Sequence, residues 1–368
     1  MKKILFLSPL PPPHYGSAMS SEECLNILKN TSKFKINNIQ LNYSKDMSDV
    51  GTINFQKIKG ILEVARKIIK TRKEKLDFIY FMPGLVGLGL YRDSFFIFLC
   101  KLFLRKKMIF HIRERITEEQ WENKFWRFLY KLNFRNSRVI VLDERLKQDL
   151  HGIIEDEKIY VLPNAIKNIV SSSKIKKIIN KRKQQNSFNI LFYSNMDKAK
   201  GWPKVLDACR ILHNKKIDFQ CKFIGAWISN KDKKEFDKFI KKNGLQEKAF
   251  SVGRKTGKER DKIIETSDIL VFPTEYKPET FGRVIIEGMM FGLPVIANGI
   301  AAIPTIIQHG KTGFVLKHNT GEEIAGYMEK LKNRRLRERM GALGRKRFLK
   351  EYEIKNYSKK FIGILNKV

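Results

Sequence analysis

Short runs of apolar residues recur along the first part of the chain, separated by longer amphipathic stretches. Four such runs, each of four or five residues, lie at 4–7, 78–82, 108–112 and 139–142. Continuous apolar runs of this length are typical of strands buried on both faces. Strands that alternate with helices predict a parallel sheet covered by helices on both sides.

This alternation stops and then begins again. Residues 171–187 are polar and rich in Lys, as in a linker or an exposed helix and connection. Five further apolar runs follow, at 190–193, 219–224, 269–272, 295–297 and 313–316. The predicted fold class is therefore α/β with two Rossmann-like, doubly wound domains, residues 1–170 and 188–349, joined by the linker 171–187. Because ligands of open α/β sheets bind outside the carboxyl ends of the strands, we expect a ligand in a cleft between the domains.

The end of the chain has a different pattern. Residues 322–367 are expected to be helical and are strongly basic, as in the stretch 330–337. A solvated helix face explains such a charge run in most proteins. We expect the last helix, 350–368, to return to the first domain.

The net charge of +35 is extreme for 368 residues. Heavy use of Lys together with Ile and Asn is one explanation. Attraction to anionic lipid, nucleic acid or phosphorylated substrates is the other, and charge alone does not choose among them.

Two further features bear on the compartment. The four cysteines are far apart and form no C-x-x-C pair, which argues against a zinc site or disulfides and fits a reducing compartment. The apolar start of the chain is short and has no cleavage site, so it is interpreted as a buried strand. The apolar region 78–104 is interrupted by Pro, Gly and charged residues, so residues 92–104 predict a core-packed helix, or one partly inserted into a lipid interface.

The stretch 272–297 carries the candidate chemistry. A strand is expected to end near Phe272, and a loop with Glu279 leads into a helix that begins near Phe281 or Gly282. Backbone N–H groups and the helix dipole favour an anion at such a helix start. Gly282 allows a ligand to approach the backbone closely.

Glu279 and Glu287 are eight residues apart, which on a helix is about 12 Å of rise. One metal ion cannot easily bind both carboxylates, but two parts of one long ligand can. The apolar neighbours of Glu287 predict a buried helix, where a carboxylate needs partners.

The spacing of these two glutamates, followed by Gly-Leu-Pro-Val-Ile-Ala at 292–297, resembles the family 4 retaining glycosyltransferases, which have the two-domain GT-B fold. Further similar segments extend over most of the chain. They lie at 12–16, which ends on Gly16, and at 161–165, 200–201, 223–225 and 310–314.

The resemblance implies roles for matching residues. Glu287 would accept hydrogen bonds from the ribose, and Glu279, with the backbone of Phe281 and Gly282, would hold the donor sugar. Lys200 would neutralise the diphosphate and stabilise the leaving group. The family needs no metal and no other cofactor, and this sequence contains no Asp-x-Asp pair.

Some positions depart from the family pattern. Asn195 stands where an arginine is common, so Arg254 or Arg283 is expected to help Lys200 bind the donor. Near the acceptor, where relatives often have a histidine, the sequence offers both His111 and Arg113 as catalytic candidates.

These observations predict a cytoplasmic enzyme, peripheral at the inner membrane face, that transfers a hexose-type sugar from a UDP- or GDP-sugar. The predicted acceptor is a polysaccharide or a lipid-linked glycan, and no nucleic acid is expected as a partner. The alternatives are a GT-B epimerase or phosphorylase, which would consume nucleotide sugar without an acceptor, and a basic RNA-binding protein. The sequence has no RNP-like aromatic pair and no helix-turn-helix signature that would favour the last.

Overall fold

The computed structural model describes residues 1–12, 16–41 and 55–368. The chain forms two compact units, residues 1–164 together with 357–368, and residues 165–356. The boundary after residue 164 has a local cause. Ile166 pairs with Glu353 in a parallel bridge, and its N–H donates to the Tyr352 carbonyl at 3.0 Å. Residues 165–170 therefore belong to the second unit, as does the segment 350–356.

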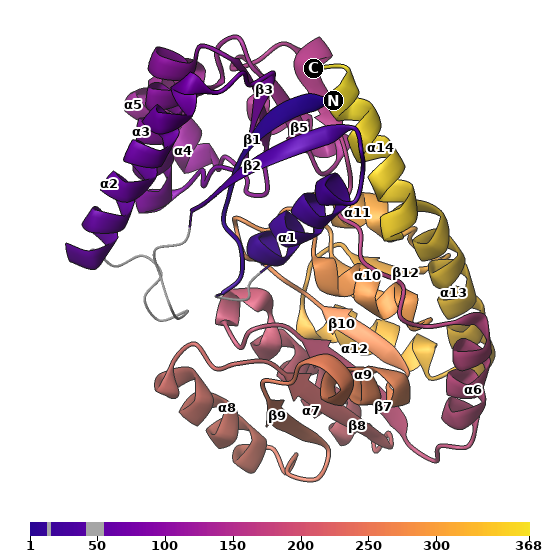
Figure 1. The fold of residues 1–368 in the computed structure, drawn as a ribbon. Helices are drawn as coiled ribbons and strands as arrows, with labels where there is room; N and C mark the ends of the chain where they lie inside the picture. The colour runs from indigo at the N-terminus through magenta and orange to yellow at the C-terminus, as the bar shows by residue number, and fades with distance from the viewer. Residues whose placement is uncertain (13–15, 42–54) are drawn as a thin grey trace. The chain divides into compact units, whose positions relative to one another are not determined.

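The first unit is built on a parallel sheet with the strand order β2-β1-β3-β4-β5-β6. Its strands are β1 (Lys2–Ser8), β2 (Phe34–Gln40), β3 (Phe78–Phe81), β4 (Lys107–His111), β5 (Arg138–Val141) and β6 (Ile159–Val161). Its helices are α1 (Gly16–Lys29), α2 (Phe55–Lys70), α3 (Gly87–Leu99), α4 (Glu118–Glu122), α5 (Lys124–Phe134) and α14 (Ile354–Asn366), with short turns of helix η2 (Thr71–Lys73), η4 (Glu144–Leu150) and η5 (Asp156–Lys158). Figure 1 shows α2, α3 and α5 side by side.

The helix expected over 92–104 begins earlier, at Gly87, and continues as the π-helical η3 (Cys100–Leu104). One side of it packs in the core of the first unit through Leu90, Phe96 and Ile97. Among the described residues, no helix has the length and apolar character required to cross a bilayer.

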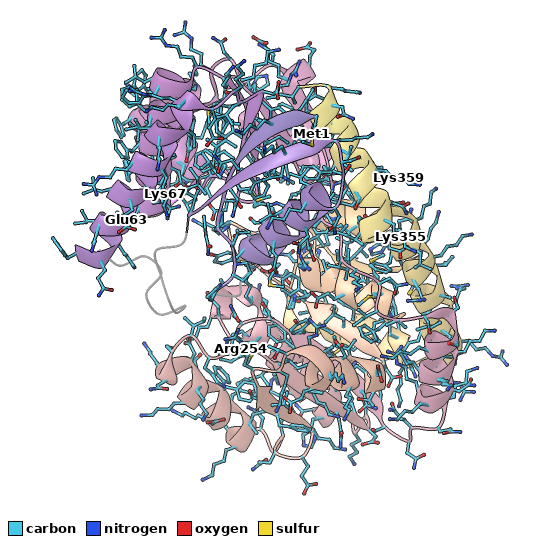
Figure 2. All side chains as sticks on the ribbon, in the orientation of Figure 1. Met1, Glu63, Lys67, Arg254, Lys355 and Lys359 are labelled. Atoms are coloured by element: carbon cyan, nitrogen blue, oxygen red, sulfur yellow. The ribbon has the colours of Figure 1, made fainter. Side chains whose placement is uncertain are left out.

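The end of the chain completes the core of the first unit. Tyr357, Phe361 and Leu365 of α14 are buried, and the Phe361 ring lies 5.6 Å from that of Tyr80 in β3. Lys355 and Lys359 of the same helix are exposed (Figure 2). The helix is thus amphipathic, and its apolar face covers the sheet.

The second unit is built on another parallel sheet, with the order β12-β11-β10-β7-β8-β9. Its strands are β7 (Phe188–Tyr193), β8 (Phe219–Ile224), β9 (Ala249–Gly253), β10 (Ile269–Phe272), β11 (Val295–Asn298) and β12 (Gly313–Leu316). Counted from β7, this is the Rossmann order, in which the winding direction reverses between β7 and β10. Ligands of such sheets bind at that reversal, outside the carboxyl ends of the two strands.

Helices cover both faces of this sheet around a core of Phe, Leu, Ile and Trp202. They are α6 (Ser172–Lys183), α7 (Trp202–Asn214), α8 (Asn230–Lys242), α9 (Gly257–Thr266), α10 (Arg283–Met290), α11 (Ile303–Ile306), α12 (Gly321–Leu331) and α13 (Arg334–Arg347), with the short η6 (Lys198–Lys200) and the π-helical η7 (Phe348–Tyr352). The expected linker 171–187 therefore consists largely of α6, which is part of the second unit.

Candidate functional site

Two loops meet where the winding of the second sheet reverses. One follows β7 and ends on Lys200, and the other follows β10 and carries Glu279. Gly201 follows Lys200 directly and lies against the second loop. It has φ +91°, and a Cβ at this position would lie 2.3 Å from the Pro273 carbonyl oxygen. Only glycine permits this approach, which also allows the Glu275 N–H to donate to the Ala199 carbonyl at 2.7 Å. The loops are therefore held against each other by their backbones.

This approach brings Lys200 and Glu279 together. Lys200 Nζ lies 2.8 Å from Glu279 Oε2 and 3.9 Å from the centroid of the Tyr276 ring. Both charged side chains are mostly shielded from solvent, which strengthens their attraction relative to that of a surface pair. A cation in this position can also bind an anionic ligand.

The second carboxylate oxygen of Glu279 lies at the start of α10. It accepts a hydrogen bond of 3.0 Å from the N–H of Gly282, which caps the helix with φ +71°. The expected anion site at this helix start is therefore filled by the carboxylate of Glu279 itself. The side chain of Phe281 is buried and packs edge-on against Tyr352, so its predicted contribution is limited to its backbone and stays a prediction.

Glu287 lies on α10, about one turn beyond this helix start, and is only 8% exposed. Arg283 Nε is 3.6 Å from its Oε1, and Arg260 Nη1 is 3.6 Å from its Oε2. Oε2 nevertheless accepts no hydrogen bond from any part of the chain that the structure describes. Burial, followed by the nearby Glu287 carboxylate, raises the pKa of Tyr193 to about 12. The Glu287 side chain is thus buried and has one oxygen that could accept a hydrogen bond from a hydroxyl donor.

Arg260 was not predicted from the sequence. It lies in the first turns of α9, the helix that follows β9. The only available signal was a cation four residues before the apolar residue Ile264 on a helix that had to cover the sheet. That pattern does not distinguish a site residue from a surface residue.

Two other predicted donor residues are exposed. Asn195 follows β7, and Arg254 follows β9 (Figure 2). Both lie after strand ends, on the edge of the sheet where the Lys200 and Glu279 loops begin. The structure does not bring either of them into contact with Glu279 or Glu287, so their roles stay predictions.

The predicted residues of the first unit lie in a buried polar network. Arg113 donates to Asn164 Oδ1, to Tyr357 Oη at 3.5 Å and to Cys24 Sγ at 3.7 Å. His111 is fully buried, and its Nδ1 is 2.7 Å from Tyr80 Oη. Burial, and then the Arg113 charge, hold the pKa of His111 well below its usual range. His111 and Arg113 thus lie in one enclosed network, and their catalytic roles stay predictions.

The glycine-bearing loop of the first unit is described only in part. Gly16 is the first residue of α1 and is exposed, whereas the predicted loop residues 13–15 lie outside the described part of the chain. Within the described ranges there is no group of three or more His, Cys, Asp or Glu side chains that could hold a metal ion. The expectation that no metal is required stays a prediction.

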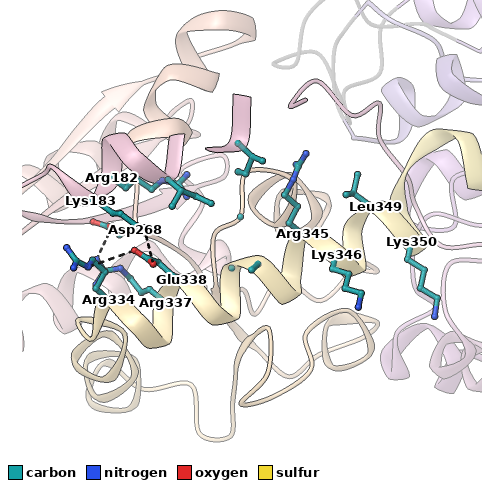
Figure 3. Close-up of a pocket in the computed structure, with 15 residues that line it drawn as sticks. Arg182, Lys183, Asp268, Arg334, Arg337, Glu338, Arg345, Lys346, Leu349 and Lys350 are labelled. Carbon is teal, nitrogen blue, oxygen red and sulfur yellow. Dashed lines mark ion pairs between the residues drawn. The ribbon is translucent and has the colours of Figure 1, made fainter. Parts of the chain in front are cut away.

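A cavity of about 590 Å³ in the second unit lies away from these residues, between α6 and α13 (Figure 3). Three of the arginines that line it hold neighbouring segments together through hydrogen bonds and an ion pair. Arg182 donates to three backbone carbonyls at 3.0 Å, and Arg345 donates to those of Met290 and Val170. Arg337 is paired with Asp268 at 3.2 Å. Burial lowers the pKa of Arg182 to about 10. The predicted donor residues do not line this cavity.

Comparison with known proteins identifies the class. Residues 173–347 match the glycosyl transferases group 1 family. An uncharacterized 41.2 kDa protein in the cps region of Klebsiella pneumoniae is 26% identical over 272 residues, which is 71% of each chain. The capsular polysaccharide biosynthesis glycosyltransferase CapM of Staphylococcus aureus is 26% identical over 218 residues, 57% of this chain and 56% of CapM. The crystal structure of Anabaena HepE in complex with UDP and glucose has a TM-score of 0.75 at 17% identity, with all of both chains covered.

The two parallel sheets and the fold shared with HepE define the GT-B architecture that the sequence predicts. Residues 173–347 form a glycosyl transferases group 1 domain, and the chain is a glycosyltransferase.

Proposed function

We propose that the chain is a retaining, metal-independent family 4 glycosyltransferase that transfers a sugar from a UDP- or GDP-sugar to a polysaccharide or a lipid-linked glycan. The name of CapM supports a role in bacterial cell-surface glycan synthesis. The UDP and glucose bound by HepE, which shares the fold, support a nucleotide-sugar donor. The enzyme would act in the cytoplasm, peripheral to the inner membrane face, where lipid-linked acceptors are available.

The observation that carries this proposal is the Glu287 carboxylate. It is buried on α10, it is flanked by two arginines, and its Oε2 has no hydrogen-bond donor among the described residues. A buried acceptor costs free energy unless a partner satisfies it. The 2′ and 3′ hydroxyls of a ribose are donors of the required kind. A nucleoside placed there would direct its diphosphate toward the start of the helix.

The Lys200 and Glu279 pair gives the proposal its chemistry. When the sugar leaves its carrier, the electrons of the broken carbon–oxygen bond leave with the diphosphate, and negative charge grows on its oxygen. Lys200 Nζ, together with the Gly282 N–H, would stabilise that charge without a metal ion. Glu279 would be displaced from both partners when the diphosphate binds and would then be available to the hydroxyls of the donor sugar. Arg283 and Arg254 are the cations proposed to assist.

A thermal-shift panel of UDP- and GDP-sugars in the presence of EDTA tests this proposal. A ligand that binds only the folded state raises the melting temperature, by an amount equivalent to about 2.7 kcal/mol at a hundred times its dissociation constant. We expect at least one nucleotide sugar to raise it. We expect Glu287→Ala to abolish that shift and Glu287→Gln to retain part of it, because the amide keeps one acceptor oxygen.

The matched control is Glu329→Ala, which removes a carboxylate of α12 that is paired with Lys215. It should keep the full shift. A Glu287→Ala protein that folds and still responds like the unmodified chain would contradict the proposal, as would a panel in which no nucleotide sugar has any effect.

A further inference from the structure

The helix pair α3 and α5 of the first unit exposes an apolar face to solvent. On α3 and η3 the exposed residues follow spacings of three and four, which keeps them on one side of the helix. The same spacing recurs on α5. We call these eight residues the α3–α5 face. They are Leu88, Tyr91, Phe95, Phe98, Leu102, Phe125, Phe128 and Leu132.

Contacts at both ends of the two helices make this face continuous. Near the start of the helices, Trp126 Nε1 donates to Tyr91 Oη at 2.7 Å, and the Tyr91 and Phe125 rings stack at 6.4 Å. At the other end, Lys101 Nζ donates to the carbonyls of Leu132 and Arg135 at 2.8 and 3.0 Å. Phe95, Phe98 and Phe128 lie along the helices between these ties.

The apolar residues of α3 are not exposed because the helix lacks a buried face. The opposite side of α3 packs inward through Leu90, Phe96 and Ile97, so the helix already has a buried face. A helix that covers a sheet normally presents polar residues to solvent. Here Phe98 is 55% exposed and Phe128 is 61% exposed. Clustered aromatic residues of this size on a surface indicate a binding partner.

The charges within the two segments that carry the face are almost all positive, whereas α4, directly before α5, has three exposed glutamates, Glu118, Glu119 and Glu122. Residues 87–107 contain five basic residues and one acidic residue, Asp93, which is buried and paired with Arg92. Residues 124–138 contain five basic residues and no acidic residue. Arg105, Lys106 and Lys107 are exposed directly after η3, and Lys131 and Arg135 are exposed on and after α5.

We propose that the α3–α5 face docks on an anionic lipid bilayer, with its aromatic side chains in the interface and its basic residues at the headgroups. Amphipathic helices that combine large apolar residues with Lys and Arg bind membranes in this way, parallel to the surface. Each basic residue near an anionic leaflet adds attraction. The inference rests on the proposed function, because it brings the enzyme to the leaflet that would hold a lipid-linked acceptor.

The charge pattern favours a bilayer over a second copy of the chain. A two-fold dimer places the same patch on both subunits, so the basic residues around this face would meet the basic residues of the partner. Nothing acidic and exposed in 87–107 or 124–138 would compensate for that repulsion. An anionic bilayer offers the apolar surface and the opposite charge together.

Vesicle sedimentation of the full chain tests the inference. The vesicles contain phosphatidylcholine alone, or with about one third phosphatidylglycerol to make them anionic. We expect strong binding to the anionic vesicles only. We expect Phe98→Ser with Phe128→Ser to weaken that binding at least about tenfold, since two large apolar side chains lose their burial in the interface.

The charge contribution is tested separately. Replacing Arg105, Lys106 and Lys107 by Gln should lower binding to anionic vesicles severalfold and reduce its dependence on salt.

Matched controls lie on the second unit. Ile228→Ser with Leu343→Ser removes two exposed apolar side chains, and Lys231, Lys233 and Lys234 replaced by Gln remove three exposed charges. Both should bind vesicles like the unmodified chain. Equal loss in the control and the test variants would overturn the inference, because binding would then follow total charge or apolar area and not this face.

Two further outcomes would overturn it. One is an unmodified chain that fails to bind anionic vesicles. The other is a chain that is dimeric by light scattering and becomes monomeric in the Phe98 and Phe128 variant. The nucleotide-sugar thermal shift is measured on the same samples, and it should be unchanged in every face variant. An unmodified chain that shows the nucleotide-sugar shift but does not bind anionic vesicles refutes only the membrane surface, and an unmodified chain that binds the vesicles but shows no shift refutes only the proposed function.

Discussion

The ammonium group of Lys200 has two partners, and they define what it can do. Glu279 neutralises it at 2.8 Å, and the Tyr276 ring offers its negative face at 3.9 Å. Glu279 meanwhile occupies the N–H of Gly282. The Glu279 carboxylate thus occupies both the Lys200 ammonium group and the Gly282 N–H, which a diphosphate would need. A nucleotide-sugar donor must therefore displace it.

Lys200→Met should lower the rate of sugar transfer by about a hundredfold to a thousandfold, because one preorganised electrostatic contact to the leaving group is lost. The free energy of unfolding should fall by only about 1 kcal/mol, since the pair is partly solvated. Release of UDP or GDP at saturating donor, followed with a coupled assay, measures the first effect, and urea denaturation measures the second.

Lys204→Met is the matched control for this prediction. Lys204 is on the next turn and pairs with Glu275 of the same loop, but that pair is more exposed. Its rate should stay within about twofold of the unmodified chain. Equal losses in the two variants would show that general positive charge near the loop, and not the position of Lys200, drives the reaction.

At the scale of elements, the site depends on two loops whose backbones touch. Gly201 separates η6 from α7, and its φ of +91° turns the chain directly against Pro273. A side chain there would have to displace the backbone of the β10 loop and, with it, the pairing of Lys200 with Glu279.

Gly201→Ala should therefore destabilise the second unit by about 2 to 4 kcal/mol, the sum of a positive φ and a steric overlap. Gly310→Ala provides the comparison, because Gly310 also has φ +74° but no atom within 4 Å of its added Cβ. It should cost only about 1 kcal/mol. Thermal unfolding of both variants checks this, and similar melting temperatures would mean that the loop yields without cost.

The strands that the apolar pattern did not predict are β2, β6 and β9, and all three lie at sheet edges. Edge strands are solvated on one side, so they need no continuous apolar run. β2 has buried residues only at its Phe34 and Ile39 positions, and β9 only at Ala249. Central strands such as β3 and β10, which are buried along their whole length, were predicted closely.

At the scale of the whole molecule, the chain crosses between its two units twice, after residue 164 and after residue 356. The second crossing places α14 on the first unit. Phe361 of this helix is fully buried, with its ring near those of Tyr80, His111 and Tyr357.

Phe361→Ala should cost about 3 to 5 kcal/mol, because it leaves a large cavity in that core. Hydrogen exchange followed by mass spectrometry should show faster exchange in peptides from 1–164 and 357–368. Phe348→Ala, at an equally buried position in η7 of the second unit, should raise exchange in 165–356 instead. Faster exchange in the same unit for both variants would contradict this division of the chain.

The sequence by itself determined the fold class and the number of Rossmann-like domains, because apolar periodicity reflects burial, and burial fixes strands and helices locally. It also predicted that Glu279 lies in the loop before a helix and that Glu287 is buried on that helix, and the resemblance to family 4 glycosyltransferases added Lys200; the roles of these residues stay predictions. Only the tertiary structure decided that Glu279 fills its own helix start, that Arg260 flanks Glu287, that His111 is enclosed, and that α3 and α5 join their exposed sides. Each of these depends on residues distant in sequence that meet only when the chain folds, and local patterns carry no record of such contacts.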